Sequence, residues 1–187
     1  MKKTAKELQL MYKELDYGLD IQNNIIYLSD SLDITDVRYV SSRFEMCKRV
    51  NSDKPINLIL SSYGGDVYSM LGIIDFMKSF DVKVNTRCYG AAMSAAAVIL
   101  ACGTGVRSMS KNATVMIHEG SIFEEGKISD VIKSSDHLKA LHKTINVLLS
   151  EVSSKDEKYW ARKTKTDLYL TSQQSLDHAI IDKIEGV

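Results

Sequence analysis

The sequence predicts a single α/β domain built on a mostly parallel sheet that is covered by helices. Strand-like and helix-like hydrophobic patterns alternate along the chain, which is the order typical of such a sheet. A chain of 187 residues buries roughly two-thirds or more of its unfolded surface, which is enough for one core. The only proline, Pro55, and the absence of Gly/Ser-rich tracts leave no linker at which to divide residues 1–187.

The first half of the chain predicts one short helix and then three strands separated by helices. Val84 and Thr86 alternate with polar residues, as in a half-buried strand, and Val67, Met70 and Ile74 recur at helical spacing. In order, the predicted elements are a helix over residues 4–17, a strand over 24–28, a helix over 33–50, a strand over 56–60, a helix over 67–77 and a strand over 82–88.

The second half of the chain predicts a further strand between helices. An apolar helix is expected after Ser94, and the alternating stretch 113–118 predicts a strand that ends on a histidine. An apolar stripe over residues 128–152 lasts about seven turns, so this helix is expected to project or to pack against a partner subunit. Thr171 and Gln174 have capping-box spacing, which predicts a last helix from residue 172 to about residue 184.

The charge balance excludes several classes of partner. The 24 basic and 24 acidic side chains cancel, and no basic stripe with interleaved aromatic residues is present, so nucleic-acid binding is not expected. Lys2 and Lys3 are followed by polar residues such as Glu7 and Gln9 instead of an apolar signal core, so neither secretion nor membrane association is expected. A cytoplasmic location is the corresponding prediction.

The cysteines predict a reducing compartment and no chemistry of their own. Cys47, Cys88 and Cys102 are odd in number, lack Cys-x-x-Cys spacing and lie in apolar settings, where cysteine packs as a small hydrophobic side chain. His137 and His142 are five residues apart and do not share a helix face, so they lack metal-ligand spacing. No metal and no cofactor are therefore expected.

A single serine, Ser94, lies in a run of small residues from Gly90 to Ala97, between a predicted strand and an apolar helical stretch. Small neighbours let the backbone turn sharply and let a substrate approach, and a helix N-terminus supplies unpaired N–H groups for negative charge. The pattern predicts a nucleophile at a strand-to-helix turn. A close-packed helix crossing would give the same pattern, so the interpretation depends on the other motifs.

Paired glycines follow the predicted strand over residues 56–60, at the carboxyl edge of the sheet. Gly64 and Gly65 permit close approach of a substrate backbone. In acyl transfer, negative charge develops on the carbonyl oxygen, and one fixed N–H directed at that oxygen is worth roughly 10²–10³ in rate. The N–H groups of Gly65 and Ala95 are the two predicted donors, although a plain tight turn would also explain a lone Gly-Gly.

His118 ends the predicted strand over residues 113–118, at the sheet edge that carries Gly65 and Ser94, and is the predicted general base. A serine hydroxyl needs a neighbouring imidazole to take its proton, and the imidazole needs a carboxylate to fix its tautomer. Asp167, flanked by apolar residues before the last helix, is the predicted orienting acid. The remaining candidates are expected to be solvated or capping groups: Asp177, Asp182, His137, His142 and His178.

The order of these motifs resembles the proteolytic subunits of the Clp proteases. The motifs that carry the resemblance are Gly-Gly after a strand, Gly-x-x-x-Ser before an apolar helix, Val-Met-Ile-His, and Asp-x-Tyr-Leu-Thr. The similarity runs from about Ile25 to Ile184. The chain order Ser, His, Asp differs from that of α/β-hydrolases and of chymotrypsin-like and subtilisin-like enzymes.

By this resemblance, Ser94 is the nucleophile, His118 the base and Asp167 the orienting acid of a serine endopeptidase. The family implies a crotonase-like fold of repeated ββα units, with a protruding handle at about residues 119–152. An extended substrate is implied between two segments, and the residues carried over for its binding are Gly64, Asp66, Val67, Gly120, Ser121 and Ile122.

The resemblance also implies a homo-oligomer of two stacked seven-membered rings that encloses a chamber for unfolded polypeptides, with a hexameric AAA+ ATPase as the unfolding partner. Residues 1–24 do not match the family's axial segment, so ATPase docking is not carried over. Met93 and Ala95 flank Ser94 where the family usually has alanine and methionine. Two alternatives stay open: a catalytically silent ring subunit, and a crotonase-like acyl-CoA enzyme that uses paired backbone donors without needing Ser94 and His118.

Overall fold

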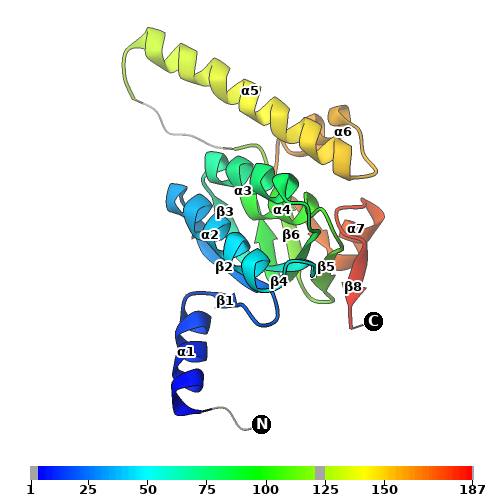
Figure 1. Ribbon diagram of the computed structural model, residues 1–187. Coiled ribbons are helices and arrows are strands. Elements are labelled where there is room, and N and C mark those ends of the chain that lie inside the picture. The colour runs from blue at the N-terminus through cyan, green and yellow to red at the C-terminus, as the bar shows by residue number, and fades with distance from the viewer. Residues whose placement is uncertain (1–3, 121–124, 187) are drawn as a thin grey trace.

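The computed structural model describes residues 4–120 and 125–186, and within them the chain forms seven helices and one sheet of eight strands (Figure 1). The predicted α/β class is confirmed. The helices are α1 (Ala5–Asp16), α2 (Ile34–Val50), α3 (Val67–Ser79), α4 (Ala95–Ala101), α5 (Ile128–Val152), α6 (Glu157–Lys163) and α7 (Ser172–Asp177). The strands are β1 (Leu19–Asp20), β2 (Ile25–Leu32), β3 (Ile56–Gly65), β4 (Val84–Met93), β5 (Arg107–Ser110), β6 (Thr114–Ile117), β7 (Leu168–Thr171) and β8 (Lys183–Glu185).

The sheet has the strand order β1-β2-β3-β4-β5-β8, and β6 pairs with both β4 and β7. Strands β2, β3, β4 and β5 are parallel to one another, as are β4 and β6, whereas β1 and β7 are antiparallel to their neighbours. In open α/β sheets, ligands bind outside the carboxyl ends of the parallel strands. The segments that follow β3, β4 and β6 all lie at this edge.

Strand β4 pairs with two different strands along its length. Its residues Thr86–Cys88 pair with β5, and its residues Ala91–Met93 pair with β6. Between the two halves lies Gly90, whose φ of +73° is a left-handed conformation that favours glycine. The change of partner brings the ends of β4 and β6 side by side, with Met93 opposite Met116.

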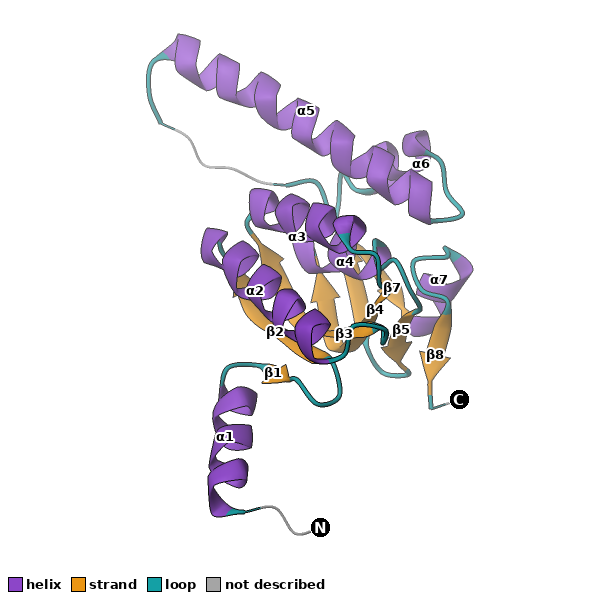
Figure 2. Cartoon of the chain, viewed as in Figure 1, coloured by secondary structure: helices purple, strands orange, loops and turns teal. Residues whose placement is uncertain are grey.

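Helices α2, α3 and α4 cover one face of the sheet (Figure 2). Side chains alternate along β3 accordingly: Ile56, Leu58 and Leu60 are fully buried, whereas Asn57 and Ile59 are half-buried. Full burial of an aliphatic side chain stabilises a fold by about 1.5–3 kcal/mol. The fixed alternation therefore sets which face of each strand the helices cover.

Polar caps in the sequence determine where several helices begin. Asp33 begins α2 with a capping box, and Thr171 and Gln174 form the predicted capping box at the start of α7. Asp66 begins α3 and accepts a hydrogen bond from the Ser69 N–H at 2.7 Å. Each such cap stabilises a helix by about 1 kcal/mol.

Helix α5 has the predicted bounds and, at 1.5 Å per residue, is roughly 37 Å long. Its C-terminal half packs against α4 and α6, with Leu149 fully buried, whereas Ile128 and Ile132 near its start are exposed. The first half projects beyond the sheet and its covering helices (Figure 1). Helix α1 lies on the side of the sheet opposite α5 and stands apart from the other helices (Figure 1).

Several predicted boundaries are wrong. Strands β3 and β4 run on to Gly65 and Met93, because the glycines and small residues keep pairing with β2 and β6. The predicted last helix ends at Asp177, and Ala179, with φ of +56°, leads the chain into β8. The elements β1, β5, β7 and α6 have no predicted counterpart, and β8 begins where the last helix was expected to end, because segments of two to seven residues are too short to display a clear period.

Arg107 joins three parts of the fold through a largely buried side chain. Its Nη1 donates to the carbonyl oxygens of Ala101 and Val152, at 3.1 and 2.7 Å, at the ends of α4 and α5. Its Nη2 and Nε donate to the Asp182 carboxylate at 2.5 and 3.1 Å. Asp182 is therefore an ion-pair partner and not the solvated or capping acid that was expected.

Arg107→Met is expected to lower the free energy of unfolding by about 2 kcal/mol, because it removes charge-assisted hydrogen bonds while keeping the volume of the side chain. Burial raises the pKa of Asp182, but the hydrogen bonds and charge of Arg107 outweigh it and hold this pKa below the ordinary value. The ion pair therefore stabilises the fold above the unfolded-state pKa, and the stabilisation is lost as the pH falls through the lower folded-state pKa. Urea unfolding over this acidic range should show a smaller pH dependence in the variant, and an unchanged dependence would contradict the assignment.

Candidate active site

Ser94 occupies the predicted turn between a strand and a helix, between Met93 at the end of β4 and Ala95 at the start of α4. Its backbone has φ of +52° and ψ of −124°, which are unusual values for a residue with a side chain. Its N–H donates to the carbonyl oxygen of Met116 at 2.7 Å, so the neighbouring strand β6 fixes the turn. Strained residues of this kind concentrate at active sites, where the surrounding structure holds them in place.

Gly64 packs directly against the serine turn, and Gly65 packs against the neighbouring strand β2. A Cβ at Gly64 would lie 2.5 Å from the Met93 carbonyl oxygen and 2.8 Å from the Ser94 Cβ. A Cβ at Gly65 would overlap the carbonyl oxygen of Leu32 on β2. Both glycines also have positive φ, +93° and +147°. Close packing therefore requires glycine at both positions, against the serine turn at Gly64 and against β2 at Gly65, so the pair is not a plain tight turn.

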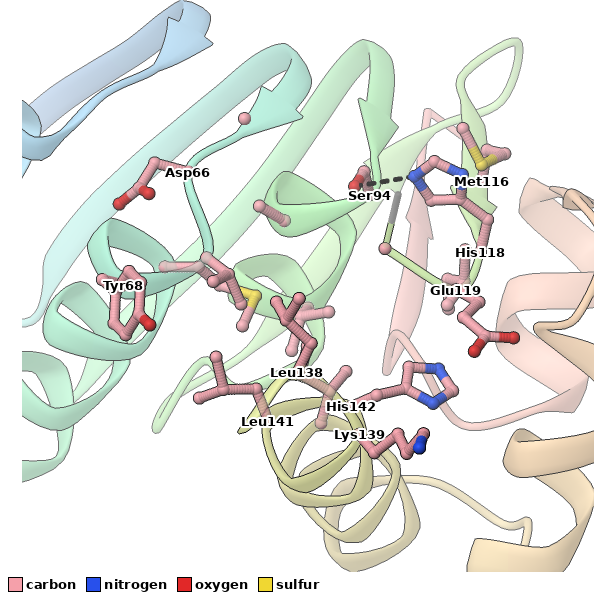
Figure 3. Close-up of a pocket in the computed structure, with 18 of the residues that line it drawn as sticks. Asp66, Tyr68, Ser94, Met116, His118, Glu119, Leu138, Lys139, Leu141 and His142 are labelled. Atoms are coloured by element: carbon pink, nitrogen blue, oxygen red, sulfur yellow. Dashed lines mark hydrogen bonds between the residues drawn. The ribbon is translucent and has the colours of Figure 1, made fainter. Parts of the chain in front are cut away.

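His118 follows β6 and contacts Ser94 directly. Its Nε2 lies 3.0 Å from the Ser94 Oγ (Figure 3), and its Nδ1 lies 3.4 Å from an oxygen of the Asp167 carboxylate. A proton on Nδ1 faces the carboxylate, which leaves Nε2 free to accept the hydroxyl proton. The Asp167 side chain is 52% exposed and that of His118 is 27% exposed. The structure thus brings together Ser94, His118 and Asp167, each of which lies next to the end of a different strand.

The rival acids lie elsewhere in the fold. Asp177 accepts a hydrogen bond from Gln173 within α7, and Asp182 pairs with Arg107. Neither carboxylate makes a hydrogen bond or ion pair with His118 among the described residues. Asp167 is therefore the carboxylate that the fold places beside His118, because β7 runs antiparallel to β6 with Leu168 opposite Ile117.

The expectation that the other histidines are solvated is wrong for His142 and His178, which are half-buried, whereas His137 is exposed as expected. His178 accepts a hydrogen bond from the Tyr159 hydroxyl at 2.7 Å, and the ring of His137 stacks on Tyr68 with its Nε2 2.9 Å from the hydroxyl oxygen. His142 is half-buried and lines the same cavity as Ser94 and His118. The side chains on α5 and α7 therefore participate in packing that a lone histidine in a sequence does not reveal.

A cavity of about 650 Å³ opens in front of Ser94 and His118 (Figure 3). Helix α5 forms the wall opposite Ser94 with Leu138, Leu141 and His142. The apolar stripe of α5 was the signal for this wall, although the stripe predicted only projection or contact with a partner. Helix α5 contributes to the cavity as well as projecting from the body.

Three of the six residues predicted to bind substrate, and both predicted oxyanion donors, lie at this cavity. The cavity is lined by Gly65, Asp66, Val67, Ala95 and Gly120. Gly64 is not a lining residue, but it packs on Ser94, and the predicted Ser121 and Ile122 lie outside the described residues. The Asp66 Oδ1 is engaged by both the N–H and the hydroxyl of Ser69, so this carboxylate serves mainly to begin α3.

The two predicted oxyanion donors flank the cavity. Ala95 is the first residue of α4, and the first N–H groups of a helix have no intrahelical partner. Gly65 lies at the end of β3, and a Cβ at its neighbour Gly64 would lie 2.9 Å from the Ala95 nitrogen. The end of β3 and the start of α4 are therefore closely packed, with both predicted donors at the same cavity.

The other reactive groups do not offer a competing chemistry. Burial raises the pKa of Cys47 and Cys102 to about 11 and that of Cys88 to about 12, so these thiols stay protonated at neutral pH. Among the described residues, no cluster of three or more histidine, cysteine, aspartate or glutamate side chains could hold a metal ion. Over the same part of the chain, no helix is long and apolar enough to cross a membrane.

The sequence is similar to known proteins over almost its whole length. The family model for Clp protease matches residues 10–186. The chain is 30% identical over 182 residues to an "ATP-dependent Clp protease proteolytic subunit" of Bacteroides thetaiotaomicron, covering 96% of this chain and 82% of that protein. It is 29% identical to proteolytic subunit 1 of Prochlorococcus marinus, covering 90% of this chain and 87% of the relative, and 29% identical to subunit 2 of Mycobacterium leprae, covering 90% and 80%. The chain belongs to the Clp protease family.

Proposed function

We propose that the chain is an active serine endopeptidase subunit of an ATP-dependent Clp protease, with Ser94 as nucleophile, His118 as general base and Asp167 as orienting acid. The single observation that carries this proposal is the 3.0 Å contact between the Ser94 Oγ and the His118 Nε2 at a strained turn. The contact lies within hydrogen-bond reach, which a general base requires.

The proposed reaction follows from this geometry. Ser94 Oγ attacks the carbonyl carbon of the peptide bond while its proton passes to His118 Nε2, and the N–H groups of Gly65 and Ala95 stabilise the resulting oxyanion. The imidazolium then protonates the leaving amine, which gives an ester between Ser94 and the acyl part of the substrate. A water molecule, deprotonated by His118, attacks the ester and releases the new carboxyl terminus.

The proposed substrate is an unfolded polypeptide in extended conformation. The segment after β3 and the segment after His118 border the cavity from two sides, so a peptide between them can add itself by backbone hydrogen bonds. Backbone pairing is compatible with many sequences. Gly64, Asp66, Val67 and Gly120, with Ser121 and Ile122, are the proposed binding residues.

The proposed assembly is a homo-oligomer of two stacked seven-membered rings around a chamber, to which a hexameric AAA+ ATPase delivers substrate. In this proposal residues 1–187 form one peptidase domain, and the handle at about residues 119–152 joins the rings through the projecting half of α5. The exposed apolar residues Ile128 and Ile132 support a contact between subunits there. The three free buried thiols are compatible with the reducing cytoplasm.

Labelling of the purified, assembled protein with a fluorophosphonate tests the proposed chemistry. An adduct on Ser94, located by peptide mass spectrometry and absent from Ser94→Ala, is expected. An Asp167→Asn variant should label more slowly, because the amide no longer favours the tautomer that accepts the serine proton. Asp177→Asn is the matched control and should label at the wild-type rate. An assembled protein that is not labelled would favour a silent ring subunit or a crotonase-like acyl-CoA enzyme.

A further inference from the structure

His142 on α5 joins two buried polar side chains near the cavity. Its Nε2 lies 3.4 Å from the Thr164 Oγ1, and its Nδ1 lies 3.4 Å from the Asn146 Nδ2. Thr164 donates its own hydroxyl proton to the carbonyl oxygen of Trp160 at 2.7 Å, so its Oγ1 is left to accept from His142. These roles require a neutral imidazole with its proton on Nε2, which accepts from the Asn146 amide at Nδ1.

Asn146 depends on His142 for its hydrogen bonding. Asn146 is only 3% exposed, and its Oδ1 has no hydrogen-bond partner among the described residues. A buried amide without partners is costly, and here the hydrogen bond to the imidazole is the one that its side chain makes within the described part of the chain. Asn146 therefore holds the ring of His142 toward Thr164.

Thr164 connects this network to the base. Its carbonyl oxygen accepts the N–H of Glu119 at 2.5 Å, and Glu119 directly follows His118. Strand β6 ends at Ile117, so this bond ties the backbone just beyond the strand. Thr164 also lies three residues before Asp167. One residue thus anchors the segments that carry both the base and its orienting acid.

We propose that His142 is a positioning residue for the catalytic base, acting through the juxtaposition of Thr164 with Glu119. This inference rests on the proposed peptidase function. The imidazole holds Thr164 and its helix α6 against α5, and Thr164 holds the chain that sets the orientation of His118. A displacement of a catalytic group by about 1 Å can lower the rate roughly 100-fold. Loss of the His142 hydrogen bonds is expected to shift His118 by less than this, and so to lower the rate about tenfold.

The experiment compares the assembled wild-type protein with His142→Leu and His142→Gln. Leucine has a side chain of similar bulk but makes no hydrogen bonds. Glutamine can donate a hydrogen bond to Thr164 and accept one from Asn146. We expect His142→Leu to lower both kcat for a peptide and the rate of fluorophosphonate labelling at Ser94 by about tenfold. KM should change less than about twofold, and His142→Gln should restore both rates to within about threefold of the wild type. Lys143→Leu, at the next and exposed position of α5, is the matched control and should behave as the wild type.

The outcomes separate this inference from the proposed function. A wild-type protein that is not labelled would overturn both, whereas a labelled wild type with an equally reactive His142→Leu variant would overturn the inference alone. A change in KM without a change in kcat, or failure of glutamine to restore the rate, would also overturn it. If His142→Leu does not fold, ¹⁵N-histidine spectra of the wild type still decide: an Nε2-protonated neutral ring supports the network, and an Nδ1-protonated ring contradicts it.

Discussion

Ser94→Ala is expected to abolish peptide hydrolysis, with kcat lowered by about 10⁵–10⁶-fold, while the subunits still assemble. The Ser94 side chain makes one hydrogen bond in the described structure, to His118, so deleting its hydroxyl removes the nucleophile and little packing. The turn itself is held by backbone groups, through the N–H of Ser94 and the carbonyl oxygen of Met116. Alanine keeps that N–H and adds no atom.

The measurement is turnover of a fluorogenic peptide together with the size of the assembly in solution. Ser42→Ala is the matched control, because Ser42 is an exposed serine on α2 whose hydroxyl donates to the Tyr39 carbonyl oxygen, remote from the cavity. The control should keep full turnover. Hydrolysis by Ser94→Ala at more than about one-thousandth of the wild-type rate would assign the chemistry to another group, and loss of assembly would show that Ser94 is structural.

The sheet could be predicted because its pattern is strong in the sequence. The long alternating or apolar segments that became β2, β3 and β4, and the apolar stripe of α5, display their periods over many residues. The small elements around β7 and β8 were missed because their ends are fixed by tertiary contacts. Helix α7, for example, ends where Ala179 takes a left-handed φ of +56°, and alanine gives no warning of that turn.

The residues around Ser94 were predictable for a topological reason. Parallel strands deliver their carboxyl ends to one edge, so a serine after one strand and a histidine after another meet if the strands are neighbours. The pairing of β4 with β6 makes them neighbours. Asp167 instead lies just before an antiparallel strand, β7. Its distance from His118 therefore could not be predicted from the meeting of parallel strands at one edge of the sheet.

The wall of the cavity and its polar network could not be predicted. A stripe of apolar residues on α5 indicates that one face is covered, but it does not say what covers it. His142 and Asn146 are four residues apart on that helix, and their partner Thr164 lies in a segment that had no predicted structure. Contacts of this kind depend on the angle at which α5 crosses the body, which no local pattern encodes.

Gly64→Ala is expected to lower kcat by about 10²–10⁴-fold, the second largest effect on turnover that the structure predicts. The added Cβ would lie 2.5 Å from the Met93 carbonyl oxygen, 2.8 Å from the Ser94 Cβ and 2.9 Å from the Ala95 nitrogen. Two of these three neighbours are backbone atoms, which cannot rotate away as a side chain does. The nucleophile and one proposed oxyanion donor must therefore move together, and each depends on position within a fraction of an ångström.

Backbone strain alone would not produce this loss, and Gly90→Ala separates the two effects. Gly90 also has a positive φ, +73°, but a Cβ there would meet only the Ser61 Oγ at 3.6 Å, an ordinary contact. Both variants pay roughly 1–2 kcal/mol for a left-handed alanine, whereas only Gly64→Ala displaces Ser94. Turnover and fluorophosphonate labelling are measured below the unfolding temperature of each variant. Equal activity of the two variants would mean that the serine turn tolerates the added methyl group, and that its close packing against Gly64 does not position the nucleophile.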